Sequence, residues 1–237
     1  MVIDDKTRAL RTLIDTAVLT PVGRLVDASN ATLLCSIDGG EENIQVIYKP
    51  IAGERPLWDF PDGDLASREV AAYYISEVGG FHLVPYTVLR DGPFGPGSVQ
   101  QWIDVDESID LAIYGQSDEP ALRSLALLDA VLNNTDRKYG HLLVDESGSL
   151  YGCDHGVTLH SDPKLRTVLW QWSGEELEPQ ERDQLNFLLT NLDRTYLADL
   201  ISGGEIAALF RRISQLLERD AFPEPSDEWP AVPWPPF

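Results

Sequence analysis

The spacing of hydrophobic and polar positions divides the chain into a strand-rich first half and a helical second half. The first half predicts five strands, placed over 22–37 (two strands around a turn at 27–30), 44–49, 83–90 and 98–103. An amphipathic helix precedes them, with Leu10, Leu13, Ile14 and Ala17 on one face. A second helix is expected over 65–78, because Gly79 and Gly80 follow it as stop signals.

Helical periodicity dominates the second half. Residues 119–133 predict a helix with Pro120 in its first turn and a buried face of Leu122, Leu125, Leu128 and Leu132. Two short strands, HLLVD and SLYGCD, follow around ESGS, and further helices are expected over 178–190 and 204–219. A polar stretch near 104–118 separates the halves. We therefore predict an N-terminal lobe at 1–103, a C-terminal lobe at 104–222, and a Pro/Trp-rich tail at 223–237 that packs through Trp229 and Trp234.

Charge and composition narrow the function. The 237 residues include 18 Lys and Arg against 39 Asp and Glu, a net charge of −21. Such an acidic surface repels nucleic acid and anionic lipid headgroups, so binding to either is not expected. Two cysteines make no disulfide framework and fit a cytoplasmic location. The N-terminus is too charged for a signal peptide, and no apolar run reaches the ~20 residues of a membrane span.

Four charged residues stand in an order that suits phosphoryl transfer. Lys49 ends a predicted strand, Glu69 lies on the next helix, Asp136 follows an apolar helix, and Asp154 ends a short strand. Each has an ordinary explanation: a surface lysine, a solvated helix charge, a helix C-cap and a turn aspartate. Phosphoryl transfer needs a lysine for the phosphates, a carboxylate that orients the nucleophile and ligands for a metal. Their order therefore favours a nucleotide site.

The same stretches resemble the protein-kinase-like superfamily, and most closely phosphatidylinositol 3-/4-kinase-like and HipA-like proteins. NTDRKYGHLL (134–143) is similar to the catalytic loop of type II phosphatidylinositol 4-kinases, and YGCDHGVTL (151–159) to their metal-binding segment. YKPIAGERPLWDFPDG and SREVAAYYISE look like the signature of a bacterial family of this kind. The resemblance covers about 23–177 and implies a two-lobed α+β fold with a small antiparallel-sheet lobe and a mainly helical lobe.

The resemblance also implies roles for individual residues. Asp136 would orient the acceptor hydroxyl, Lys49 would contact the phosphates of ATP, and Glu69 would orient Lys49. The implied nucleotide contacts are a phosphate turn of Ser29, Asn30, Ala31 and Thr32 and an adenine-binding hinge of Gln100, Gln101 and Trp102. His141 and Asp154 would hold Mg²⁺. The usual loop ligand is asparagine, so His141 either favours Mn²⁺ or marks a missing metal site.

Two segments beside these residues carry further charge. The loop ERPLWDF (54–60) is either a lid over the cleft or a loop pinned to the body by Trp58. Lys164 and Arg166 follow the metal segment, and these cations could hold an acidic substrate or a phosphate.

The leading hypothesis is an ATP-dependent phosphotransferase that acts on a hydroxyl of a protein or small cytoplasmic molecule. Three alternatives stay open. They are nucleotidyl (AMP) transfer on the same fold, a pseudokinase that serves as an interaction module, and a domain without a nucleotide site.

Overall fold

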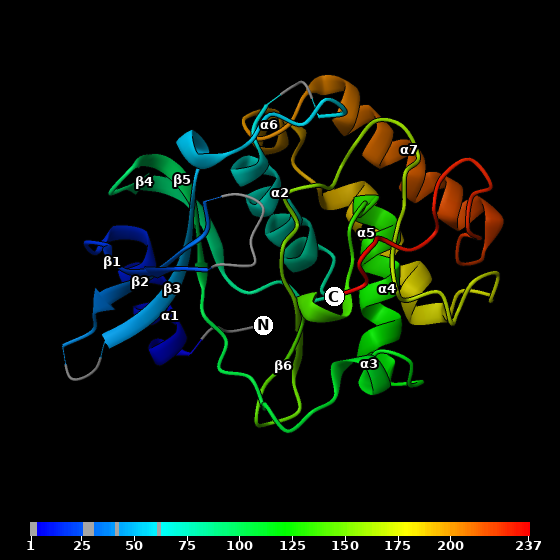
Figure 1. Cartoon of the computed structure of the whole chain (residues 1–237). Coiled ribbons are helices and arrows are strands. Elements are labelled where there is room, and N and C mark those ends of the chain that lie inside the picture. The colour runs from blue at the N-terminus through cyan, green and yellow to red at the C-terminus, as the bar shows by residue number, and fades with distance from the viewer. Residues whose placement is uncertain (1–3, 26–30, 41–42, 61–62) are drawn as a thin grey trace.

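A five-stranded antiparallel sheet forms one side of the molecule (Figure 1). The computed structural model describes residues 4–25, 31–40, 43–60 and 63–237. The spatial order of the strands is β1-β2-β3-β5-β4. Their bounds are β1 (Thr20–Arg24), β2 (Leu33–Asp38), β3 (Asn43–Pro50), β4 (Thr87–Gly92) and β5 (Gly95–Gln101). The five predicted strands are therefore confirmed, and the turn predicted at 27–30 lies largely outside the described residues.

The β4–β5 hairpin differs from its prediction. β4 begins at Thr87, four residues later than predicted, and both strands continue into the DGPFGPG stretch expected to be a turn. Gly92 pairs with Gly95, so only Pro93 and Phe94 connect the strands. Gly95 adopts a φ of 92°, which glycine tolerates without steric cost and which permits so tight a connection.

A small hydrophobic core lies between the sheet and helix α1 (Asp5–Thr16). Asp4 caps this helix by accepting a hydrogen bond of 2.9 Å from the backbone N–H of Thr7. Ile14 is fully buried, and the rest of the predicted apolar face packs around it, which confirms the amphipathic prediction. The core of this layer consists of Ile14, Leu19, Cys35, Ile37, Val46, Tyr48 and Val99.

The second layer is helical. Its elements are α3 (Leu111–Tyr114), α4 (Pro120–Leu132), the 3-10 helix η2 (Tyr139–His141), the hairpin β6 (Leu142–Val144) and β7 (Leu150–Gly152), α5 (Pro179–Asn191), α6 (Arg194–Ala198) and α7 (Gly203–Arg219). The four leucines predicted as the buried face of α4 are fully buried. Helices α3 and α6 were not predicted, because four or five residues are too few to display a helical period.

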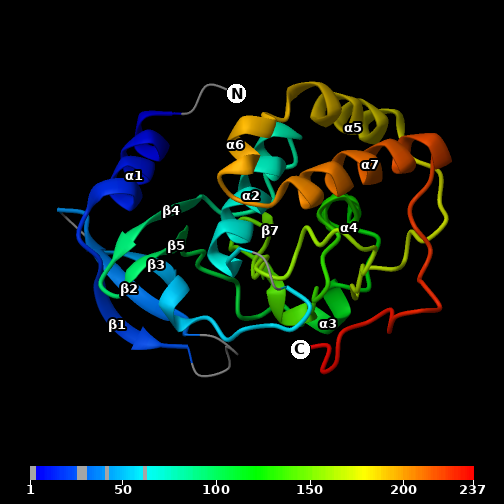
Figure 2. The same ribbon diagram turned by 90° about the horizontal axis from the view of Figure 1, so that it is seen from above.

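Helix α2 (Leu65–Val78) lies between the sheet and the other helices in both views (Figures 1 and 2). Its bounds match the prediction. Asp64 caps its first turn, and Glu54 in the preceding loop accepts hydrogen bonds of 2.9 Å from the N–H groups of Leu65 and Ala66. Its apolar residues Val70, Ala71, Ala72 and Ile75 belong to the larger core, which is built mainly from the helical layer.

A buried ion pair adds to the connection between α2 and the helical layer. Arg68 of α2 lies 2.6 Å from Glu205 of α7, and both side chains are almost completely buried. Arg68 also donates to the backbone carbonyl of Thr158 at 3.0 Å. Helix α2 is therefore fixed to the helical layer at both its apolar and its charged positions.

The segment after α7 has no regular secondary structure, as predicted, and returns along the surface of the helical layer (Figure 2). Trp229 faces the Lys164 ammonium at 5.0 Å from its ring centroid. The prediction that Trp234 also packs on the body is wrong, because Trp234 is 86% exposed. Within the described part of the chain, no helix combines the length and apolar character needed to cross a membrane.

Candidate functional site

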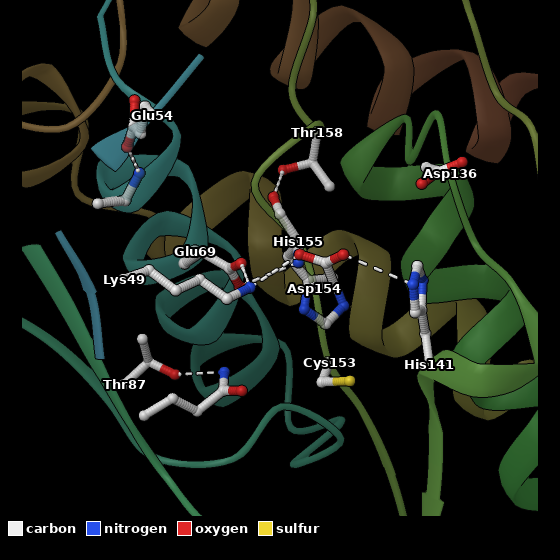
Figure 3. A network of polar contacts seen from close by, with 12 residues as sticks. Lys49, Glu54, Glu69, Thr87, Asp136, His141, Cys153, Asp154, His155 and Thr158 are labelled. Carbon is white, nitrogen blue, oxygen red and sulfur yellow. Dashed lines mark hydrogen bonds and ion pairs between the residues drawn. The ribbon is translucent and has the colours of Figure 1, made fainter. Parts of the chain in front are cut away.

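Lys49 joins two carboxylates from different parts of the fold (Figure 3). It lies on β3, where it pairs with Ser98 of β5, and its side chain points toward α2. Its Nζ atom forms an ion pair with Glu69 of α2 and lies 2.8 Å from Oδ1 of Asp154. Glu69 also accepts a hydrogen bond of 2.9 Å from the N–H of His155. The structure therefore brings together three residues that are far apart in the sequence.

The charges of this cluster stabilise one another. Burial lowers the pKa of Lys49, but the two carboxylates outweigh this effect and raise it above its usual value. The Lys49 ammonium in turn holds the pKa of Asp154 well below its usual range. Lysine and aspartate are thus both charged at neutral pH. A cation and a carboxylate in contact are the groups that bind phosphates and a divalent metal.

Asp154 has a strained backbone. Its φ is 59°, in the left-handed region, which a non-glycine residue occupies at an energetic cost. Gly156, two residues later, does not have a positive φ. A Cβ atom added at Gly156 would lie 3.2 Å from Cβ of Leu65, which is tighter than an ordinary van der Waals contact. The segment that carries Asp154 therefore packs closely against the start of α2.

Asp136 lies on the loop that follows α4. It is not the helix C-cap that the simplest interpretation predicts, because Asn133 occupies that position with a φ of 52°. Asn134 holds the loop by accepting a hydrogen bond of 3.0 Å from the N–H of Asp136. Lys138 Nζ lies 3.4 Å from the Asp136 carboxylate. Burial raises the pKa of Asp136, while Lys138 and Arg166 oppose this rise and Asp154 adds to it.

Arg137 connects the loop of Asp136 to the segment of Asp154, and sequence reasoning gave it no role. Its guanidinium pairs with Asp129 of α4 at 2.9 Å, and both side chains are fully buried. It also donates to the Cys153 carbonyl at 2.9 Å and to Nε2 of His155 at 2.7 Å. Burial and the Arg137 cation hold the pKa of His155 well below its usual value, so this ring is neutral. The available signal was an aspartate inside the apolar run LALLDAVL.

His141 faces the second oxygen of Asp154, with Nε2 3.5 Å from Oδ2. Burial lowers the pKa of His141 to about 4, so the ring is neutral at physiological pH. Its Nδ1 accepts a long contact of 3.4 Å from the N–H of Lys138. The structure therefore places both predicted metal ligands side by side. Within the described ranges, no group of three or more His, Cys, Asp and Glu side chains is arranged to hold a metal ion.

The predicted nucleotide contacts are only partly described. Ser29 and Asn30 of the phosphate turn lie outside the described residues. The Ala31 N–H donates to the Gly53 carbonyl at 3.2 Å, and Thr32 is buried with its carbonyl accepting from Leu25. The Ala31 N–H and the Thr32 carbonyl are thus already hydrogen-bonded within the lobe.

The predicted hinge continues the sheet. Gln100 is buried and donates from its side chain to Thr87 at 2.8 Å. The N–H groups of Gln101 and Trp102 donate to the carbonyls of Tyr86 (2.8 Å) and Gln45 (3.4 Å). Backbone donors for adenine are therefore not free at Gln101 and Trp102, and these residues remain predicted only as the lining of the connection between layers.

Solved structures with the same architecture are atypical kinases. Hydra Fam20, solved with sugar, superposes with a TM-score of 0.62 at 12% identity, covering 92% of this chain and 89% of that one. The Golgi casein kinase with Mn/ADP bound superposes with a TM-score of 0.60 at 15% identity, covering 92% of this chain and 76% of that one. The proinflammatory kinase CtkA of Helicobacter pylori gives 0.50 at 11% identity, covering 88% and 94%. The predicted two-lobed kinase-like fold is confirmed. These similarities do not single out the phosphatidylinositol 3-/4-kinase or HipA families.

Sequence comparison gives a much closer relative. No family model matches the sequence. Protein Rv2133c of Mycobacterium tuberculosis is 38% identical, and the alignment covers 92% of both proteins. Identity at this level over nearly the full length of both chains shows common descent and a common fold. The chain therefore belongs to the same family as Protein Rv2133c.

Proposed function

We propose that this chain transfers a phosphoryl group from ATP to a hydroxyl group of a small molecule or a protein. The observation that carries the proposal is the position of Lys49, held between Glu69 and Asp154 while Asp136 lies on the neighbouring loop. The kinase-like fold and the resemblance of NTDRKYGHLL and YGCDHGVTL to phosphatidylinositol kinase-like proteins support the same activity. Fold alone does not define function, so the proposal depends mainly on the arrangement of the site residues.

Each charged residue has a distinct task in this proposal. Lys49 binds the α- and β-phosphates of ATP, and Glu69 keeps its ammonium in place. Asp136 orients the acceptor hydroxyl and accepts its proton, which its partly buried carboxylate can do while ionised. The buried Arg137 positions the loop of Asp136 relative to Asp154. Positioning and charge compensation supply most of the catalysis in phosphoryl transfer.

A divalent metal fits this cluster in part. Asp154 is a charged oxygen ligand of the kind that Mg²⁺ and Mn²⁺ prefer, and such ions take their remaining ligands from phosphates and water. His141 fits only with its proton on Nδ1, which would end the contact with the Lys138 N–H. Bound there, the metal would offset negative charge on the phosphates. The solved Golgi casein kinase complex with Mn and ADP is consistent with this chemistry.

Thermal stability with ATP, alone and with Mg²⁺ or Mn²⁺, tests the site. A ligand at about 100 times its dissociation constant adds about 2.7 kcal/mol to the free energy of unfolding. We expect a metal-dependent stabilisation that Asp154→Asn abolishes and Asp136→Asn preserves. If Asp154→Asn responds to ATP and metal as the wild type does, the site is wrongly assigned.

Isotopically labelled ATP distinguishes the two transfer reactions. Phosphoryl transfer moves label from the γ-phosphate to the acceptor, whereas AMP transfer moves label from the α-phosphate. We expect γ-label transfer that Asp136→Asn removes. Transfer of α-label would replace the proposal with nucleotidyl transfer, and nucleotide binding without either transfer would leave a pseudokinase.

A further inference from the structure

The residues after α7 cover the backbone beside Asp136. The N–H of Tyr139, three residues after Asp136, donates to the Pro236 carbonyl at 2.8 Å, and the rings of Tyr139 and Phe237 lie 5.4 Å apart. The Ala231 carbonyl accepts from the N–H of Thr167 at 3.0 Å and from the Trp170 indole at 2.9 Å. The tail thus occupies backbone donors on both segments that flank Asp136.

This arrangement disfavours an extended peptide as acceptor. A peptide that adds to an exposed backbone edge binds through main-chain N–H and carbonyl groups. At Tyr139 and Thr167 the N–H groups already donate to carbonyls of the same chain. A small molecule needs no such edge, and the Asp136 side chain is 32% exposed.

Two cations flank Asp136 in a chain that is otherwise strongly acidic. Lys138 Nζ lies 3.4 Å from the Asp136 carboxylate. Arg166 is held against the same loop by its backbone, since its N–H donates to the Asn134 carbonyl at 2.8 Å and its carbonyl accepts from Arg137 at 3.1 Å. Among the described residues, the buried Nε of Arg166 has no hydrogen-bond partner.

An anion beside Asp136 would pair with the charges of Lys138 and Arg166. A guanidinium presents a planar set of donors that matches phosphate oxygens, and a lysine adds a mobile positive charge. The net charge of −21 makes non-specific attraction of anions weak, so a response to phosphate at this place would be specific.

We infer that the acceptor is a small hydroxyl compound that already carries a phosphate group, bound by Lys138 and Arg166 beside Asp136. This inference rests on the proposed phosphotransferase function. The acceptor hydroxyl oxygen forms a bond to the γ-phosphorus of ATP, the bond from that phosphorus to the bridging oxygen breaks, and ADP leaves with the electron pair. Asp136 takes the hydroxyl proton.

Inorganic phosphate is the first probe, and it requires no nucleotide. The shift in melting temperature with phosphate is measured at constant ionic strength, each variant against its own value without phosphate. We expect a saturable shift in the wild type that weakens at least tenfold in apparent affinity in Lys138→Gln and Arg166→Gln. Arg166→Lys keeps the charge without the planar donors, so its apparent affinity for phosphate should lie between those of the wild type and Arg166→Gln. Lys6→Gln, an exposed lysine on α1, is the matched control and should bind as the wild type does.

Lys49→Met separates the two anion sites of the proposal. It should keep the phosphate response, because Lys49 belongs to the nucleotide site. If Lys49→Met loses the response while Lys138→Gln and Arg166→Gln retain it, phosphate binds at the nucleotide site and the inference is overturned. A response unchanged in all these variants overturns it as well.

The second arm offers γ-labelled ATP with paired acceptors. Glycerol 3-phosphate and sugar phosphates are compared with glycerol and the free sugars, and with neutral and acidic peptides that contain serine. We expect label only in phosphorylated small molecules, with the Lys138→Gln effect on KM for the acceptor and not on that for ATP. Preferential labelling of peptides or of unphosphorylated compounds contradicts the inference. Absence of metal-dependent ATP binding in the wild type instead defeats the proposed function.

Discussion

The guanidinium of Arg137 lies 2.9 Å from the carboxylate of Asp129, and both side chains are completely buried. This contact fixes the loop after α4 to the helix itself. Because Arg137 also donates to the carbonyl of Cys153, one buried side chain links the segments of Asp136 and Asp154. The geometry of the candidate site therefore depends on a charge pair that is closed to solvent.

Removing one partner of this pair should be costly. Asp129→Asn leaves a buried guanidinium without its counter-charge, and we expect the free energy of unfolding to fall by about 3–5 kcal/mol. Urea denaturation followed by circular dichroism measures the change. Asp118→Asn, at an exposed aspartate near the start of α4, is the control and should stay within about 0.5 kcal/mol of the wild type. Equal stability of both variants would mean that the pair does not hold the loop.

Lys49 should contribute to the affinity for ATP but not to the affinity for adenosine, which lacks phosphates. Lys49→Ala removes the side chain that joins Glu69 and Asp154, and with it the charge proposed to meet the phosphates. We expect affinity for ATP to fall at least tenfold while affinity for adenosine changes little, as measured by isothermal titration calorimetry. A parallel loss for both ligands would move Lys49 away from the phosphates.

A branched side chain at Gly156 should destabilise the fold. A Cβ atom would lie 3.2 Å from Cβ of Leu65, and the branched side chain of valine adds atoms in the same space. Gly156→Val should therefore lower the free energy of unfolding by about 1–3 kcal/mol through overpacking. Gly203→Ala, where no atom lies within 4 Å of the added methyl group, is the control in the same denaturation experiment. Wild-type stability of Gly156→Val would contradict the close packing of the segment on α2.

The two cysteines should alkylate slowly in the folded protein. Burial raises the pKa of the Cys153 thiol to about 12 and also raises that of Cys35. The thiolate is the reactive form, and a raised pKa reduces the thiolate fraction at every pH below it. Between pH 7 and 9, iodoacetamide labelling followed by mass spectrometry should be far slower than for a free thiol. Urea-unfolded protein should label fully, and rapid labelling of folded protein would refute the burial.

Trp229 and Trp234 allow a matched comparison between a packed and an exposed tryptophan of the tail. Trp229 packs on the Lys164 ammonium, whereas Trp234 is 86% exposed. A cation–π contact of this kind contributes about 0.5–2 kcal/mol. Trp229→Ala should therefore speed hydrogen exchange at Thr167, whose N–H donates to the tail, by about 2- to 30-fold. Trp234→Ala should leave exchange there unchanged, and equal effects would mean that the Trp229 contact does not hold the tail.

Long periodic segments and the order of charged residues were predictable from the sequence. Helix α2 has the bounds that its pattern and following glycines predict, and Glu69 on that helix meets Lys49 as expected. In both cases the determining signal is local, either an apolar period or a charge at the end of a regular element.

Features that depend on contacts between distant segments were not predictable. In the sequence, Arg137 looks like an ordinary loop charge next to Asp136. Only the folded structure shows that it is buried and paired with Asp129. The left-handed backbone of Asp154 could not be predicted, because the residue at that position is not a glycine. The backbone donors at Gln101 and Trp102 are used by strand partners that a single stretch of sequence does not identify.

The ion pair between Lys49 and Asp154 has a mechanical consequence for the molecule. Lys49 lies on β3 of the sheet, whereas Asp154 follows β7 of the helical layer. A displacement of the sheet relative to the helical layer would therefore change the length of this contact. The distance between the Lys49 ammonium and the Asp154 carboxylate thus measures how far the two layers have separated. A distance probe placed across this contact would follow that separation directly.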